Sequence, residues 1–122
     1  MQIEIKGRNV PVHDDLRRHV ERRLAKVSRQ VSELARLEIE LMRERNPRVA
    51  ASQVAEATLY LKGATLRARD ASPQMLHSLN LVVDELARQV KRHRVMRRRR
   101  RKTRAALAQH TSVLAPEAPA AP

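Results

Sequence analysis

Two segments that alternate between apolar and polar residues constrain the fold of this chain more than any other feature. They are Val54–Leu61 and Ala64–Ala71, separated by Lys62–Gly63. A two-residue linker containing glycine is typical of a β-hairpin. Pairing outward from this linker brings apolar residues together on one face and polar residues on the other, including the opposite charges of Glu56 and Arg69. The sequence therefore predicts a hairpin with one buried face.

Two more strands and two helices are expected from the spacing of apolar residues. The strands are Gln2–Lys6, which Gly7 ends, and Leu37–Leu41; the loops are Arg8–Pro11 and Arg43–Ser52. One helix begins at Asp14 or Asp15 and buries Leu16, Val20, Leu24 and Val27. The other has Ser72 as N-cap and Pro73 at its first helical position, and buries Met75, Leu79, Val82, Val83, Leu86 and Val90. Spacings of three and four residues place each set on one helix face.

The element order β-α-β-β-β-α predicts an α+β fold, a two-layer sandwich of a four-stranded mixed sheet with both helices on one face. The first two strands, joined through a helix, should be parallel neighbours. We expect one domain over residues 1–96 and a basic extension of the last helix over 97–104. Residues 105–122 should form a flexible Ala/Pro-rich tail or linker, after at most one more helical turn at Ala105–Leu107.

Positive charge is concentrated near the end of the last helix. The formal net charge is +13, and 11 of the 26 Lys and Arg residues lie in 88–104. They are Arg88, Lys91, Arg92, Arg94, Arg97–Arg101, Lys102 and Arg104. No acid occurs between Glu85 and Glu117. Such a block attracts polyanions, or it is a solvated tail; because it continues an amphipathic helix, we favour a positioned RNA or DNA contact.

Two further surfaces are charged. In the first helix Arg18, Arg22, Lys26 and Arg29 lie opposite the apolar stripe, and either contact phosphates or form an ordinary solvated face. The exposed sheet face should carry Glu4, Glu38, Glu40 and Glu56 beside Lys6, Arg67 and Arg69. We therefore expect an electrostatically two-sided molecule, with its helix side toward the polyanion.

The chain lacks the residues and motifs that several other classes of function require. The chain has no Cys and only one aromatic residue, Tyr60, so it lacks the aromatic platform on which many RNA-binding modules stack bases. The five histidines have no metal-ligand spacing, no glycine-rich phosphate loop occurs, and Asp84 with Arg88 reads as an i, i+4 helix pair. We expect a cytoplasmic protein that is not an enzyme, with no cofactor, metal, small-molecule ligand or membrane partner.

Three segments resemble the ribosome hibernation-promoting factor family, which includes ribosome-associated inhibitor A. They are Met1–Val10 (MQIEIKGRNV), Leu59–Ala68 (LYLKGATLRA) and Val82–Arg94 (VVDELARQVKRHR). The resemblance covers roughly residues 1–96 and implies a β-α-β-β-β-α fold similar to a double-stranded-RNA-binding domain. The chain departs from the family pattern at His13, Leu76, Asn80 and Glu85, where the family usually has Thr, Tyr, Asp and Lys.

The resemblance also implies a function. Such proteins bind 16S rRNA of the small ribosomal subunit near the decoding centre, block the A and P sites, and keep 70S ribosomes idle in starvation or stationary phase. Carried over, the rRNA-binding residues are Arg88, Lys91, Arg92 and Arg94, extended by Arg97 and Arg98, with Arg18, Arg22 and Lys26 from the first helix. The main alternative is a non-specific double-stranded nucleic-acid-binding protein. A further alternative is a transcription regulator that acts through protein contacts. The chain is either a short form of the family or a long form truncated in its linker.

Overall fold

The structure, a computed structural model, describes residues 1–114. Its elements are β1 (Gln2–Arg8), α1 (Asp14–Gln30), β2 (Arg36–Arg43), β3 (Gln53–Leu61), β4 (Ala64–Ser72) and α2 (Met75–Leu114). The chain divides into a compact unit, Met1–Val90, and a second unit that begins at Lys91 within α2. The expected Ala/Pro-rich segment Ala115–Pro122 lies outside the described residues.

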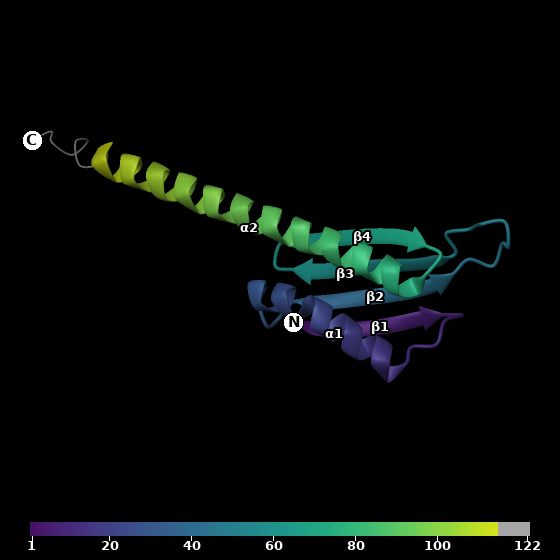
Figure 1. Cartoon of the computed structure of the whole chain (residues 1–122). Helices are drawn as coiled ribbons and strands as arrows, with labels where there is room; N and C mark the ends of the chain where they lie inside the picture. Colours follow the sequence, from purple (N-terminus) through teal and green to yellow (C-terminus); the bar gives the residue numbers. More distant parts are fainter. Residues whose placement is uncertain (115–122) are drawn as a thin grey trace, which may run out of the picture. The chain divides into compact units, whose positions relative to one another are not determined.

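The first unit is a two-layer sandwich. Its strands follow the order β1-β2-β3-β4, with β1 parallel to β2 and the other neighbours antiparallel. Helix α1 and the first turns of α2 lie on the same face of this sheet (Figure 1). The predicted α+β fold with a mixed four-stranded sheet is confirmed.

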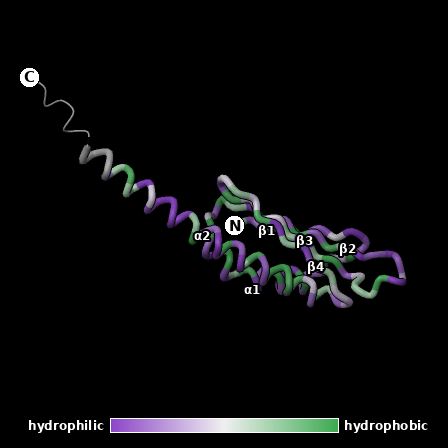
Figure 2. The backbone as a smooth tube through the Cα atoms, turned by 90° about the horizontal axis from the view of Figure 1, so that it is seen from above, coloured by the Kyte–Doolittle hydropathy of each residue, from purple (hydrophilic) through white to green (hydrophobic). Residues whose placement is uncertain are grey.

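The core lies between the sheet and the two helices. Fully buried side chains come from both layers and include Leu24, Leu37, Ile39, Leu41, Leu59, Leu79 and Leu86. Each is worth about 1.5–3 kcal/mol of burial, before the loss of chain entropy. Every residue of the two predicted helix stripes packs in or against this core as expected, although Leu16 and Met75 are only partly buried there. In Figure 2 the tube becomes predominantly hydrophilic along the later turns of α2.

The predicted hairpin is confirmed with its register. Leu61 pairs with Ala64 across the Lys62–Gly63 turn, and Glu56 pairs with Arg69 at 3.5 Å between the guanidinium and the carboxylate. Gly63 has φ of +78°, in the left-handed region that glycine adopts without a Cβ clash.

The first predicted loop was wrong at its start, because β1 continues through Gly7 to Arg8. Gly7 serves a different purpose from ending the strand. A Cβ at this position would collide with the backbone oxygen of Val10, so the absence of a side chain allows the turn after β1 to fold back closely. This turn also uses Asn9 in the left-handed conformation, with φ of 57°.

The predicted N-cap of the second helix was also wrong. Ser72 is the last residue of β4, and α2 begins at Met75. The Ser72 hydroxyl accepts a hydrogen bond from the backbone N–H of Gln74 (3.2 Å) and lies 2.7 Å from the Ser78 hydroxyl. Ser78 in turn donates to the backbone oxygen of Gln53 at 2.6 Å. A buried hydroxyl pair thus joins the start of α2 to the sheet. The helix then runs to Leu114, well past the expected end near Leu107.

Candidate nucleic-acid interface

The positive charge is distributed unequally between the two units. Residues 1–90 contain 16 Lys/Arg and 12 Asp/Glu, whereas residues 91–122 contain 10 Lys/Arg and a single acid. The first unit is therefore close to electrically balanced, and the segment that follows it is strongly cationic. Any polyanion-binding surface must depend heavily on the second unit for long-range attraction.

In α1 the predicted cations are exposed but accompanied by acids. Arg18, Arg22 and Lys26 all face solvent, as expected. Asp15 and Glu21 line the same shallow surface as Arg18 and Arg22, and the Arg18 guanidinium lies 3.9 Å from the Asp15 carboxylate. This face offers donors to a phosphate, but its local net charge is small.

Side-chain contacts between α1 and α2 fix how the two helices align. His19 hydrogen-bonds Asn80 at 3.1 Å, and Arg23 forms an ion pair with Asp84 at 3.0 Å. Residue 19 contacts residue 80, and residue 23 contacts residue 84, so the residue numbers increase in the same direction along both helices. The two helices therefore run parallel. Both contacts bind α1 to α2, a role for Arg23 and Asp84 that the sequence did not indicate.

Arg88 has a different partner from the one predicted. The expected i, i+4 pair with Asp84 is wrong, because Asp84 is paired with Arg23. Arg88 instead donates from Nε (3.0 Å) and Nη2 (2.7 Å) to the Glu85 carboxylate. The residue is exposed and keeps further N–H donors. Any phosphate that binds Arg88 must nevertheless compete with Glu85.

The described part of the second unit is a cationic helix. Side chains 91–109 are exposed, except for the half-buried His93 and Arg94. The predicted residues Lys91, Arg92, Arg97 and Arg98 therefore all reach solvent. Because successive residues turn by 100°, five consecutive arginines, Arg97–Arg101, leave no side of the helix without a guanidinium. We refer to residues 91–104 as the basic segment.

The open face of the sheet differs from the expectation. Arg8 and Arg36 join Lys6, Arg67 and Arg69 there, so that the four glutamates are matched by five cations. Ion pairs link the two sets, for example Arg8 with Glu40 at 2.6 Å and Arg36 with Glu38 at 3.6 Å. The first unit is therefore not electrostatically two-sided. The sequence could have indicated that Arg36 lies on the open face, because the alternation of apolar and polar residues in β2 extends from Arg36 to Met42.

The single aromatic ring does not provide a base-stacking platform. The Tyr60 hydroxyl donates to Glu38 at 3.4 Å, and the Arg36 guanidinium covers the ring at 4.8 Å from its centroid. Within residues 1–114 there is no group of three His, Cys, Asp or Glu side chains suited to a metal ion. Over the same part of the chain, no helix is long and apolar enough to cross a membrane.

Comparison with known proteins gives a consistent result. The model of the family described as "Sigma 54 modulation protein / S30EA ribosomal protein" matches residues 3–98. A ribosome hibernation promotion factor from a Picosynechococcus species is 30% identical over 77% of this chain and 49% of its own length. A ribosome hibernation promoting factor from Azotobacter vinelandii is 29% identical over 77% of this chain and 83% of its own length. The chain thus spans about half the length of some curated relatives.

A solved structure agrees with these matches. The crystal structure of the N-terminal domain of Thermus thermophilus Protein Y superposes with a TM-score of 0.65 and 28% identity, over 76% of this chain and 99% of that domain.

Proposed function

The chain belongs to the family of sigma 54 modulation and S30EA ribosomal proteins, and from that premise we propose that it is a ribosome hibernation factor. It binds 16S rRNA of the small subunit near the decoding centre, blocks mRNA and tRNA from the A and P sites, and inhibits translation in 70S ribosomes under stress or in stationary phase. The names of its relatives support the hibernation role.

The observation that carries the proposal is the junction of a folded unit with the basic segment. A preformed α+β unit supplies a fixed shape, and a helix with cations on all sides directly follows it. Affinity for RNA would come from phosphate neutralisation and counterion release. Selection of one rRNA site would come from the shape and charge pattern of the folded unit, since it lacks a free aromatic platform.

The proposed rRNA-binding residues come from both helices. They are Arg88, Lys91, Arg92, Arg94, Arg97 and Arg98 in α2, and Arg18, Arg22 and Lys26 in α1. Each has a guanidinium or ammonium group able to contact phosphate oxygens. Inhibition requires no chemical step: a protein that occupies the decoding region excludes the ligands that bind there.

Sedimentation with separated ribosomal subunits tests the proposal. We expect the protein to sediment with small subunits, to be absent from large subunits at the same concentration, and to inhibit translation in a purified system. A competitor mRNA with bound initiator tRNA should displace it. Equal binding to both subunits, or binding that mRNA and tRNA do not reduce, would contradict the proposed site.

A non-specific double-stranded nucleic-acid-binding protein is the alternative, and the uniform run Arg97–Arg101 favours it. That run offers charge on every side without residues chosen for particular bases. This alternative predicts similar affinity for any RNA or DNA duplex. Hibernation predicts that a large excess of duplex leaves small-subunit binding largely intact.

A further inference from the structure

The open face of the sheet, opposite α1 and the first turns of α2, carries an apolar row at one end. Met42 pairs with Val54 across β2 and β3, and Val54 pairs with Ala71 across to β4. The other outward rows of this face are charged or polar at almost every position. Met42 and Val54 are only half-buried, so their outer surfaces face solvent without a cover from the first unit's helices.

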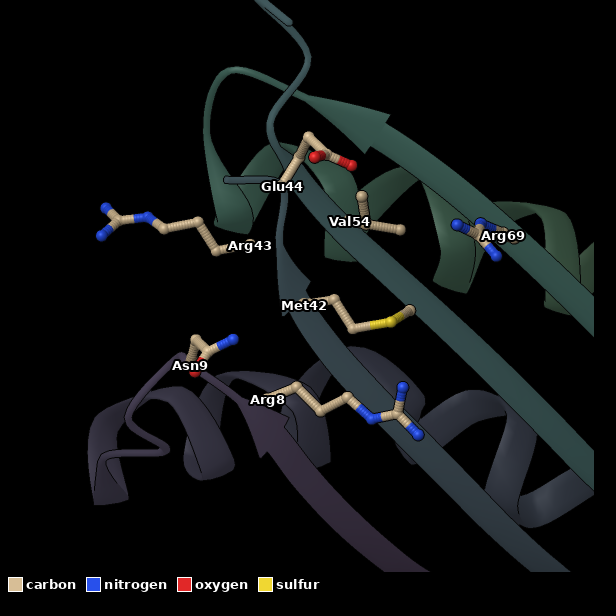
Figure 3. A pocket seen from close by; sticks show the side chains of 7 residues that line it. All are labelled: Arg8, Asn9, Met42, Arg43, Glu44, Val54 and Arg69. Atoms are coloured by element: carbon tan, nitrogen blue, oxygen red, sulfur yellow. The ribbon is translucent and has the colours of Figure 1, made fainter. Parts of the chain in front are cut away.

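Guanidinium groups lie on two sides of this row. Arg8 pairs directly with Met42 across β1 and β2, and Arg69 lies two residues from Ala71 on β4. Figure 3 shows the side chains of Met42 and Val54 between those of Arg8 and Arg69, whereas Arg43 points away. Together they line a pocket of about 220 Å³.

Ion pairs hold both guanidinium groups in place without using all their donors. The Nε of Arg8 lies 2.6 Å from the Glu40 carboxylate, and Nη1 of Arg69 lies 3.5 Å from the Glu56 carboxylate. A guanidinium has five N–H donors, so each can still bind a phosphate oxygen. Glu44 also lines the pocket and disfavours a phosphate at its own edge.

We propose that this pocket binds one nucleotide of a single-stranded RNA, with the base over Met42 and Val54 and the phosphate at Arg8 and Arg69. A methionine thioether makes favourable contacts with aromatic rings, and arginine stacks on bases. The volume is below the 300–1,000 Å³ typical of sites for larger ligands, and suits a single base.

The inference rests on the proposed function, because a ribosome-bound protein is surrounded by RNA. It adds a second RNA contact on the face opposite the helices. A protein that grips two RNA segments on opposite faces would act as a spacer between them. A single-stranded segment is the proposed occupant, because the pocket is shallow and lies on the open face of the sheet.

Methionine methyl NMR on the full chain tests the site. The chain has four methionines, and Met42 is the one in the pocket, whereas Met96 lies in the basic segment. Tetra-adenylate RNA should shift the Met42 methyl signal upfield through the ring current of the base. Inorganic phosphate should not produce that shift, and adenosine monophosphate should produce it only at about tenfold higher concentration or more, because it lacks the flanking phosphates.

Two matched variants identify the residues. Arg8→Ala with Arg69→Ala removes the two guanidinium groups on either side of Met42 and Val54, and should weaken the Met42 response about tenfold or more. Arg36→Ala with Arg67→Ala removes two cations from the same face outside the pocket, and should leave the response within about twofold. Unchanged Met1 and Met75 signals, which report on the core, confirm that each variant is folded.

Several outcomes would overturn the inference: no Met42 shift with tetra-adenylate, the same shift with phosphate alone, equal effects of the two variants, or equal affinity for mononucleotide and tetramer. An exclusive response of Met96 would assign RNA binding to the basic segment. Sedimentation of the wild-type chain with small subunits is measured in parallel. If the protein sediments with small subunits but tetra-adenylate does not shift the Met42 methyl signal, the pocket inference fails and the proposed function stands.

Discussion

Residues 1–90 and the basic segment use the same kinds of charged side chain in opposite ways. In the first unit cations form ion pairs with acids, and three of these pairs join β1 to β2, β3 to β4 and α1 to α2. In the basic segment the sequence provides no acid between Glu85 and Glu117. The first unit thus fixes the positions of its charges, whereas the second accumulates charge. Under the proposed function, we expect the first unit to select the RNA site and the second to provide most of the affinity.

The largest expected effect is the difference in unfolding free energy between a core substitution in the first unit and a substitution in the basic segment. Leu86 is fully buried, and Leu86→Ala should lower the free energy of unfolding by about 2–5 kcal/mol. Met96 is 52% exposed, and Met96→Ala should change it by less than about 0.5 kcal/mol. Urea denaturation measures both. Similar losses in the two variants would show that the basic segment is part of the cooperative core.

Most of the fold followed from the sequence because the first unit obeys simple periods. Alternation in the hairpin determined both strands and their register, and the helix stripes identified the residues that the helices contribute to the core. The errors lie where tertiary contacts override local rules. Ser72 has the chemistry of a cap, but the sheet needs it as the last residue of β4. Gly7 resembles a strand breaker, but serves a close turn after Arg8.

The site was less predictable than the fold. Exposure of the predicted cations followed from helix periodicity, but their partners did not. Which acid holds Arg88 depends on side-chain geometry, since Asp84 and Glu85 are both within reach along a helix. The apolar row with Arg8 and Arg69 joins residues from four strands, and single-sequence patterns do not show which strand ends meet.

A smaller effect on stability tests the buried hydroxyl pair. Ser78 is fully buried and links Ser72 to the backbone oxygen of Gln53. Ser78→Ala leaves that oxygen and the Ser72 hydroxyl short of a partner, and should cost about 1–3 kcal/mol in the free energy of unfolding. Thr103→Ala, which removes a hydroxyl bond within the cationic helix, should cost less than about 0.5 kcal/mol. Equal costs would remove this distinction between the units.

Releasing Arg88 should produce a modest gain in binding. Glu85→Lys removes the carboxylate that Arg88 contacts and adds a cation beside it. Small-subunit binding should strengthen a few-fold at low salt, and the log–log salt slope should steepen by roughly one to two. Glu33→Lys makes the same charge change at an exposed loop position. If this control has the same effect, the gain reflects overall charge and the position of Arg88 is unimportant.

The smallest expected effect concerns the helix of the basic segment. Like charges four residues apart, such as Arg94 with Arg98 and Arg98 with Lys102, each destabilise a helix by about 0.2–0.5 kcal/mol. Raising the salt concentration should therefore slightly increase the circular dichroism signal of helix at 222 nm. Arg98→Glu turns both repulsions into attractions and should reduce that salt dependence. A signal that falls with salt in the wild-type chain would contradict this explanation.

The division of roles between the two units can be tested most directly by one salt titration on two RNA targets, small subunits and an unrelated RNA duplex. One variant changes Arg97–Arg101 to Ala; its matched control changes five first-unit cations to Ala, namely Arg18, Arg22, Lys26, Arg29 and Arg88. The Arg97–Arg101 variant should bind duplex far more weakly, with a log–log slope smaller by roughly three to four, yet still prefer small subunits. The control should keep duplex affinity and lose the preference. Loss of preference in the Arg97–Arg101 variant, with an unaffected control, would contradict the account.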